Sequence, residues 1–180
     1  MTVATKAEKF IVDACVLQSF ATVDRLDLLE AHCENDATWT RAVQYEVKRG
    51  VQHASCLERV LQCEWLGEPV DVPGDILALV QVETIRKALG GQHNRPTEHL
   101  GEAETIYYIE TVRPTAVFVT DDRPAADFAQ RRGIRVMNSA DVLRERHRHN
   151  QIGCPDAYEL LRRMAEDGRG VYIPPHGDVC

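Results

Sequence analysis

The sequence has no long apolar run and no excess of positive charge. A helix that spans a membrane needs about 20 apolar residues in a row, and no stretch of the 180 residues approaches that length. Acidic residues outnumber basic ones by 28 to 21, which gives a formal net charge of -7. This balance excludes a protein that binds nucleic acid through charge alone. We expect a cytoplasmic protein with no membrane partner.

Several familiar site motifs are also missing. Neither GxGxxG nor a P-loop occurs, so Gly90-Gly91 does not predict a nucleotide-binding loop. The Asp13-Ala-Cys segment lacks the second aspartate of a haloacid-dehalogenase-type phosphatase. The six cysteines include no CxxC pair, which predicts reduced thiols, and no neighbouring base marks any of them as a nucleophile.

The sequence also lacks a complete zinc-finger unit. His53, Cys56 and Cys63 form one partial set, and His176 and Cys180 form another. Neither set supplies four ligands at finger spacing. We therefore expect Cys56 and Cys63, which are one heptad apart, to belong to the apolar stripe of a helix.

What the sequence does contain is an alternation of short apolar runs and helical patterns. The runs at 10–12, 37–40, 116–120 and 134–137 predict strands. Helical spacing covers 17–32, 43–51, 55–65, 76–89, 101–112, 124–132, 140–148 and 154–168. Alternating strands and helices predict an α/β fold, a three-layer α/β/α domain with a parallel sheet of about four or five strands. We predict that this domain covers 1–150 and that a C-terminal helix and tail extend over 151–180.

Acidic residues follow two of the predicted strands. Asp13 comes directly after the run at 10–12, and Asp121 and Asp122 come after the run at 116–120. Because ligands bind beyond the carboxyl ends of strands in open α/β sheets, we expect these side chains to share one edge. Glu46 lies within a predicted helix, and Glu102 opens another.

A cluster of such carboxylates needs a cation. Like charges a few ångströms apart raise each other's pKa unless a metal compensates them. Oxygen ligands without nitrogen favour Mg²⁺ or Mn²⁺. A metal held in this way activates water and balances charge on phosphorus, which suits phosphodiester hydrolysis.

The segments that carry these acids resemble the successive motifs of PIN-domain nucleases. They are Phe-Ile-Val-Asp13-Ala, the helical Glu46, Gly101-Glu102-Ala103-Glu104 and Val-Phe-Val-Thr120-Asp121-Asp122-Arg123. The resemblance covers about 10–141. It implies a Mg²⁺- or Mn²⁺-dependent endoribonuclease that cleaves single-stranded RNA. Many such proteins are toxins of bacterial toxin–antitoxin pairs (the VapC-like branch), which would add an antitoxin partner and a homodimer.

The resemblance also assigns roles to individual residues. Asp13 matches the first acid of the family, Glu46 the second and Asp122 the last. The third acid, usually aspartate, falls on Glu102 or Glu104. Beyond the resemblance, we expect Asp121 to be an added metal ligand, Thr120 to orient a ligand or water, and four arginines to contact RNA: Arg123, Arg144, Arg146 and Arg148.

Each of these residues also has a simpler explanation. The aspartates suit helix caps or turns, and Glu46 suits an ion pair with Arg41 or Arg49 on a helix surface. Arginines at the end of the 140–148 helix complement its dipole without RNA. Two other functions therefore stay open: a catalytically inactive PIN-like module that docks a basic partner peptide, and a nuclease of the same fold that acts on DNA.

Overall fold

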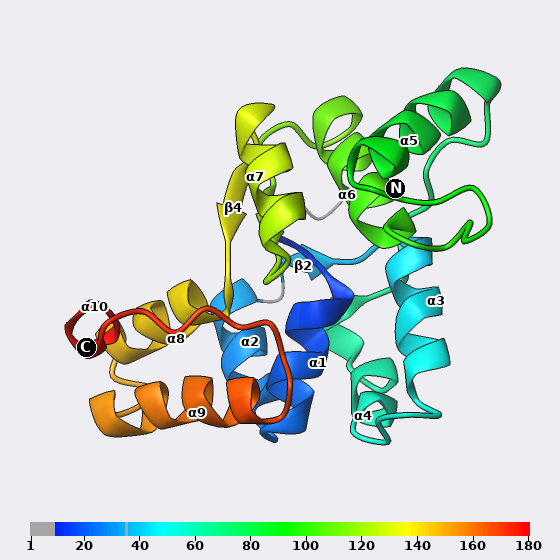
Figure 1. The fold of residues 1–180 in the computed structure, drawn as a ribbon. Coiled ribbons are helices and arrows are strands. Elements are labelled where there is room, and N and C mark those ends of the chain that lie inside the picture. Colours follow the sequence, from blue (N-terminus) through cyan, green and yellow to red (C-terminus); the bar gives the residue numbers. More distant parts are fainter. Residues whose placement is uncertain (1–9, 35) are drawn as a thin grey trace, which may run out of the picture.

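The computed structural model describes residues 10–34 and 36–180, and its centre is a parallel sheet between two layers of helices (Figure 1). Residues 1–9 of the predicted domain lie outside the described residues. The elements, in chain order, are β1 (Phe10–Val12), α1 (Ala14–Thr22), α2 (Leu26–Cys33), β2 (Ala37–Thr38), α3 (Arg41–Gly50), α4 (Leu57–Leu61), the 3₁₀ turn η1 (Glu64–Leu66), α5 (Ile76–Ala88), α6 (Leu100–Thr111), β3 (Val117–Val119), α7 (Arg123–Arg131), β4 (Arg135–Met137), α8 (Ser139–Arg148), α9 (Cys154–Glu166) and α10 (His176–Val179).

The sheet has four parallel strands in the order β2-β1-β3-β4, which confirms the predicted architecture. Ile11 pairs with Thr38 on one side and with Phe118 on the other, and Val12 pairs with Val119. From β1 the chain continues to β2 at one edge and later returns to β3 on the opposite side of β1. The carboxyl ends of β1 and β3 are therefore neighbours at the point where the strand order reverses, which is where ligands bind in such sheets.

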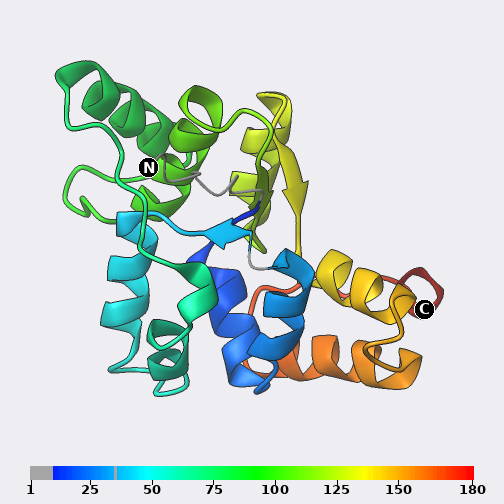
Figure 2. The same cartoon turned by 180° about the vertical axis from the view of Figure 1, so that it is seen from behind.

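Successive strand residues face opposite helical layers, as the period of two in a strand requires. Phe10, Val12 and Val119 pack in a core with residues of α1, α2, α3, α8 and α9. Ile11 and Phe118 pack in a second core with residues of α5, α6 and α7. The two central strands, β1 and β3, are apolar on both faces because both faces are covered. Seen from behind, β2 closes one side of the sheet (Figure 2).

Aspartates fix where three of the helices begin. Asp13, Asp75 and Asp122 accept hydrogen bonds from the first turns of α1, α5 and α7. This pairing satisfies backbone N–H groups that a helix leaves without partners. The simpler explanation of Asp13 and Asp122 as caps is thus correct, and it also places both side chains at strand–helix junctions.

Two predicted helices are wrong in their continuity. The helix expected over 17–32 is divided into α1 and α2, because Asp24 adopts a left-handed conformation with a φ of 59°. The helix expected over 55–65 is reduced to α4 and η1. In both cases apolar residues on either side of the break still reach the same core. The spacing of apolar residues therefore does not reveal the break.

The segment after 150 packs into the core of the domain. Leu160, Leu161 and Met164 of α9 lie in the same cluster as Val16 and Leu17 of α1. The division into 1–150 and 151–180 stays a prediction. None of the helices formed by the described residues is both long and apolar enough to cross a membrane.

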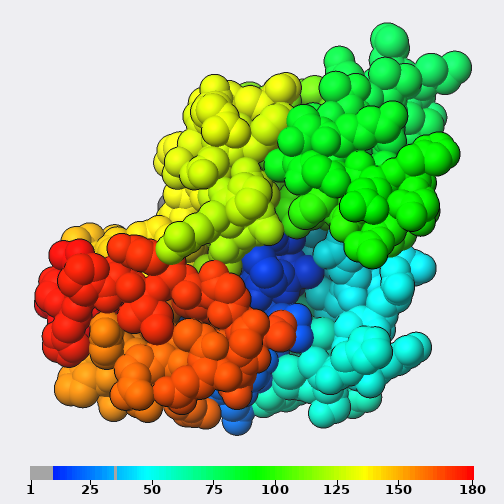
Figure 3. Space-filling model, viewed as in Figure 1, coloured from blue at the N-terminus to red at the C-terminus, as the bar shows by residue number. Residues whose placement is uncertain are grey.

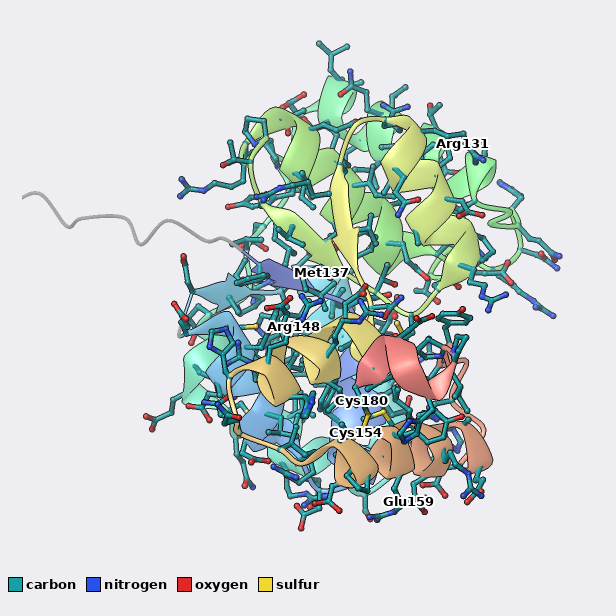
Figure 4. All side chains as sticks on the ribbon, turned by 90° about the vertical axis from the view of Figure 1, so that its left-hand side faces the viewer. Arg131, Met137, Arg148, Cys154, Glu159 and Cys180 are labelled. Carbon is teal, nitrogen blue, oxygen red and sulfur yellow. A yellow bond between two sulfur atoms is a disulfide. The ribbon has the colours of Figure 1, made fainter. Side chains whose placement is uncertain are left out.

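One prediction about the cysteines is wrong. Cys154, at the start of α9, and Cys180, after α10, form a disulfide (Figure 4). They are 26 residues apart, so no local spacing marks them as partners. Cys15, Cys33, Cys56 and Cys63 remain thiols.

Candidate metal centre

The site begins where β1 and β3 end. Asp13, which is 2% exposed, accepts hydrogen bonds at one oxygen from the Ala14 backbone (2.8 Å) and at the other from the Thr120 hydroxyl (2.8 Å). The same hydroxyl accepts a bond from the backbone N–H of Asp122 (3.1 Å). Thr120 therefore connects the two aspartates through a single oxygen atom. A carboxylate has about four lone-pair positions, so each aspartate keeps capacity for a further ligand.

Glu46 reaches the site from α3 because α3 packs closely against the start of α6. Its Oε1 accepts a hydrogen bond from the backbone N–H of Gly101 (3.2 Å). A Cβ at position 101 would lie 2.9 Å from that oxygen and 3.1 Å from a methyl group of Val43. Glycine is thus required for this approach of the two helices, and the N-terminus of α6 favours the negative charge of Glu46.

Glu102 and Glu104, the two candidates for the third acid, point in different directions because both lie on helix α6. Glu102 interacts electrostatically with Asp13, Glu46 and Asp122. Glu104, two residues on, instead accepts a hydrogen bond from the Ala42 backbone at the start of α3 (3.0 Å). Of the two alternatives that the sequence leaves open, the geometry favours Glu102.

The charges of these acids are poorly compensated by the protein. Burial, together with the neighbouring Asp13, raises the pKa of Glu46 to about 7 and that of Glu102 to about 9. Burial also raises the pKa of Asp13, although hydrogen bonds from Cys15, Thr120 and Ala14 oppose that rise. His99 lies 3.6 Å from Glu102, and Arg49 lowers the pKa of Glu46 only in part. A bound cation would compensate these charges.

The donor set fits a hard divalent ion. Asp13, Glu46, Glu102 and Asp122 supply oxygen atoms alone, as Mg²⁺ and Mn²⁺ prefer. Within 10–34 and 36–180, no three of these acids bring one oxygen each within 4.8 Å of one another. The spacing of the acids therefore suits an ion that keeps some of its water and contacts some of the acids through that water. It suits an ion bound only by protein oxygens less well.

Asp121 has surroundings that differ from those of these four acids. Both of its oxygens are used by α8 and α1: one accepts from the Ser139 backbone (2.8 Å), and the other accepts from the Ser139 hydroxyl (2.6 Å) and from Ser19 (3.3 Å). Its burial and its three donors make it an anchor between elements. Of the adjacent aspartates, only Asp122 belongs to the group of four acids.

Cys15 is a contact that the sequence did not predict. Its thiol lies 3.1 Å from Asp13 and accepts a bond from the backbone N–H of Asp121 (3.3 Å). Burial and the nearby Asp13 raise the pKa of the thiol well above its usual value. The thiol stays protonated and positions Asp13, so it is no nucleophile. His99 was also missed, although a histidine three residues before a glutamate is a visible pairing signal.

Two cavities open beside different acids of this group. One, of about 360 Å³, is lined by Gln18, Asp122, Arg123 and Arg169. Another, of about 240 Å³, is lined by Glu46, Arg49, Gln52 and His53. In Figure 3 the blue surface of the first residues after β1 lies between the cyan, green, yellow-green and orange-red segments that carry these groups.

The three predicted arginines of α8 do not share one role. Arg146 is 6% exposed and donates to the carbonyl of Ala31 and the side chain of Gln151, both at 2.9 Å, so it is unavailable to RNA. Arg144 is engaged by Asp141 and the Asp178 carbonyl. Arg148 is exposed and pairs with Glu145. The helical charge pattern did not reveal that one of these side chains points inward.

A comparison with protein families agrees with this geometry. A family model described as a PIN domain matches residues 9–176. The match runs past the sheet and includes α9 and the chain up to α10. No curated protein and no solved structure matches the chain.

Proposed function

Because the chain belongs to the PIN-domain family, we propose that it is a Mg²⁺- or Mn²⁺-dependent endoribonuclease that hydrolyses phosphodiester bonds of single-stranded RNA. PIN domains are generally metal-dependent nucleases. The observation that carries the proposal is the gathering of Asp13, Glu46, Glu102 and Asp122 at the end of β1 and β3, where burial raises the pKa of three of them.

The residues of the chain divide the work at the site. Asp13 and Asp122 would hold the metal, with Glu46 and Glu102 completing its shell directly or through water. The bound ion would lower the pKa of a water and offset charge on the phosphoryl oxygen. Thr120 orients Asp13 by donating a hydrogen bond from its hydroxyl, and the backbone N–H of Gly101 donates one to Glu46. Burial and the neighbouring Asp13 raise the pKa of Glu102, which favours its protonated form when no cation is bound.

The RNA strand would run from one of these cavities to the other, across the acids. Arg123 and Arg169 line the cavity beside Asp122, and Arg49 lines the cavity beside Glu46. The backbone on either side of the scissile phosphate would thus meet positive charge, while the acids and their metal face the phosphate itself. The guanidinium of Arg123 stacks on Tyr172 at 5.3 Å, which holds it in position.

The direct test measures cleavage of a labelled single-stranded RNA. We expect cleavage with Mn²⁺ or Mg²⁺ and none with EDTA. The rate of cleavage should fall at least about 100-fold in the D13N variant, because an amide NH₂ group replaces one carboxylate oxygen. Asp75→Asn is the matched control, since Asp75 caps α5 as Asp13 caps α1, and asparagine caps as well as aspartate. Equal activity of D13N and wild type would contradict the site.

The two alternative functions, an inactive binding module and a nuclease that acts on DNA, predict different results in titration and competition experiments. A catalytically inactive module would bind a basic peptide through its acids and show no heat on titration with Mn²⁺. A nuclease directed at DNA would be inhibited by unlabelled single-stranded DNA more strongly than by RNA. Our proposal expects metal-dependent heat and stronger competition by RNA.

The toxin role, an antitoxin partner and a homodimer are further parts of the proposal that rest on the resemblance of the motifs. We expect expression of the wild type, and not of D13N, to arrest bacterial growth. Equal growth with both proteins would remove the toxin role while leaving the nuclease proposal in place.

A further inference from the structure

A second group of metal-binding side chains lies far along the chain from the acids. Cys154 begins α9, His176 begins α10 and Cys180 follows α10. One ligand atom from each, two Sγ and one imidazole nitrogen, lie within 4.8 Å of one another, and no other group of three or more such residues is found in the part of the chain that the structure describes. We propose that the reduced form of this group, with the disulfide opened, is a Zn²⁺ site.

The histidine already has the placement that zinc requires. Its Nε2 is 3.8 Å from the sulfur of Cys154 and 4.0 Å from that of Cys180. With Zn–S bonds of about 2.3 Å and a Zn–N bond of about 2.0 Å, a tetrahedral site puts nitrogen and sulfur about 3.5 Å apart. The imidazole therefore needs to move by only a few tenths of an ångström.

The two sulfurs need the larger change. Two thiolates on one tetrahedral zinc lie about 3.8 Å apart, which is impossible while they share a covalent bond. The Cα atoms are 5.2 Å apart, so rotation of the side chains separates the sulfurs without moving either helix. The disulfide and the zinc complex are thus two alternative states of one group.

Tyr158 holds the imidazole toward the sulfurs. It lies one turn after Cys154 on α9, and its ring contacts that of His176 with centroids 4.9 Å apart. Cys154 is partly exposed, and His176 and Cys180 are exposed. The ring is therefore oriented by the protein, while an ion or a reductant reaches the group from solvent.

The chemistry of this group differs from that of the acidic site. Thiolate and imidazole ligands select zinc over Mg²⁺ or Mn²⁺. Three protein ligands leave a fourth position for water, so the zinc is exchangeable, unlike that of a closed four-ligand site.

The change between the two states balances with a dithiol reductant. One thiolate of the reductant attacks a sulfur of the disulfide, and its second thiol then releases the protein. Two electrons pass to Cys154 and Cys180, which become thiols, and the reductant becomes a disulfide. Zn²⁺ then replaces the two thiol protons, which leave to solvent. In either state the residues that follow α9 are fastened to its first turn.

The test compares oxidised and reduced protein. The full chain is reduced with dithiothreitol, freed of reductant without oxygen, and titrated with Zn²⁺ against a chromogenic chelator and with Co²⁺. We expect one more equivalent of Zn²⁺ in reduced than in oxidised protein, together with thiolate-to-cobalt charge-transfer absorption. Because Cys15, Cys33, Cys56 and Cys63 are thiols in both samples, they do not produce the difference.

Variants of the individual residues test which side chains bind the extra Zn²⁺ and produce the cobalt absorption. Cys154→Ser and His176→Gln should lose the extra equivalent and the absorption, and Cys63→Ser, the matched control, should keep both. The D13N variant should also keep them, which separates this site from failure of the proposed nuclease. Equal zinc binding by oxidised and reduced wild type, or absorption that persists in Cys154→Ser, would overturn the proposal.

Discussion

At the residue scale, the two adjacent aspartates after β3 have different surroundings although they have the same chemistry. Asp121 is fully engaged with Ser139 and Ser19, whereas Asp122 accepts one bond at a single oxygen, from the Ala125 backbone (2.7 Å). A buried polar group that loses its hydrogen-bond partner destabilises a protein, and Asp122 has fewer such partners to lose than Asp121. Substitutions should therefore distinguish them.

We expect Asp121→Asn to reduce stability and Asp122→Asn to reduce metal binding. The new amide at position 121 would face a donor on Ser139 or Ser19, which should lower the free energy of unfolding by about 1–3 kcal/mol and leave Mn²⁺ affinity unchanged. An asparagine at position 122 can still cap α7, so Asp122→Asn should keep its stability and bind Mn²⁺ at least about tenfold more weakly. Chemical denaturation and calorimetry measure the two effects, and the reverse pattern would make Asp121 the ligand.

The acids also predict how stability depends on pH. Glu46 and Glu102 have an ordinary pKa of 4.5 and titrate at about 7 and about 9 in the folded protein. Above about pH 4.5 the unfolded chain releases protons that the native protein retains, so stability falls as pH rises toward those values. For Glu46 the loss is about 3 kcal/mol at about 1.36 kcal/mol per pH unit.

We therefore expect the melting temperature of the protein in chelator to fall between about pH 5 and pH 9. Glu102→Gln should flatten this dependence, because the amide has no charge to bury. Saturating Mn²⁺ should oppose the fall, because it compensates the charges. The exposed Glu58→Gln is a matched control that should leave the curve unchanged. A melting temperature that rises with pH in chelator would show that these charges are already compensated.

At the scale of elements, the contact between α3 and α6 decides whether Glu46 reaches the site. Gly101→Ala would place a Cβ 2.9 Å from Glu46 and 3.1 Å from Val43. Overpacking of this kind costs about 1–3 kcal/mol, and a displacement of about 1 Å at a reacting group reduces rates about 100-fold.

We expect Gly101→Ala to lower both RNA cleavage and Mn²⁺ affinity. Gly74→Ala is the control, since a Cβ there would contact nothing within 4 Å. If Gly101→Ala cleaves RNA as fast as wild type, then Glu46 is not held by this helix contact.

At the scale of the whole molecule, the chain after α9 returns to the site from the opposite end of the sequence. Arg169 and Gly170 line the cavity beside Asp122, and Tyr172 packs on Arg123. The disulfide between Cys154 and Cys180 closes the loop that contains them.

Removing this link should loosen the whole fold. For a loop of this length the entropy of the unfolded chain corresponds to about 3–4 kcal/mol. We expect the free energy of unfolding of the Cys154→Ser/Cys180→Ser double variant to be lower than that of oxidised wild type by up to this amount, seen as a lower midpoint of urea unfolding. Cys63→Ser should match wild type. An unchanged midpoint would mean that α9 and α10 are held by packing alone.

The layers of the fold and the acids that follow its strands can be predicted from the sequence alone. Short apolar runs followed by aspartate indicate buried parallel strands and helix caps. Both features can be read from the sequence because each depends on residues that are adjacent in the chain. The breaks at Asp24 and after α4 were missed because apolar spacing continues across them.

Which groups meet depends on the tertiary structure. The choice of Glu102 over Glu104, the inward turn of Arg146, the anchoring of Asp121 and the pairing of Cys154 with Cys180 all depend on the packing of elements distant in sequence. A carboxylate or guanidinium has the same chemistry on any helix, and its role is set by burial and by the partners that the fold brings within a few ångströms.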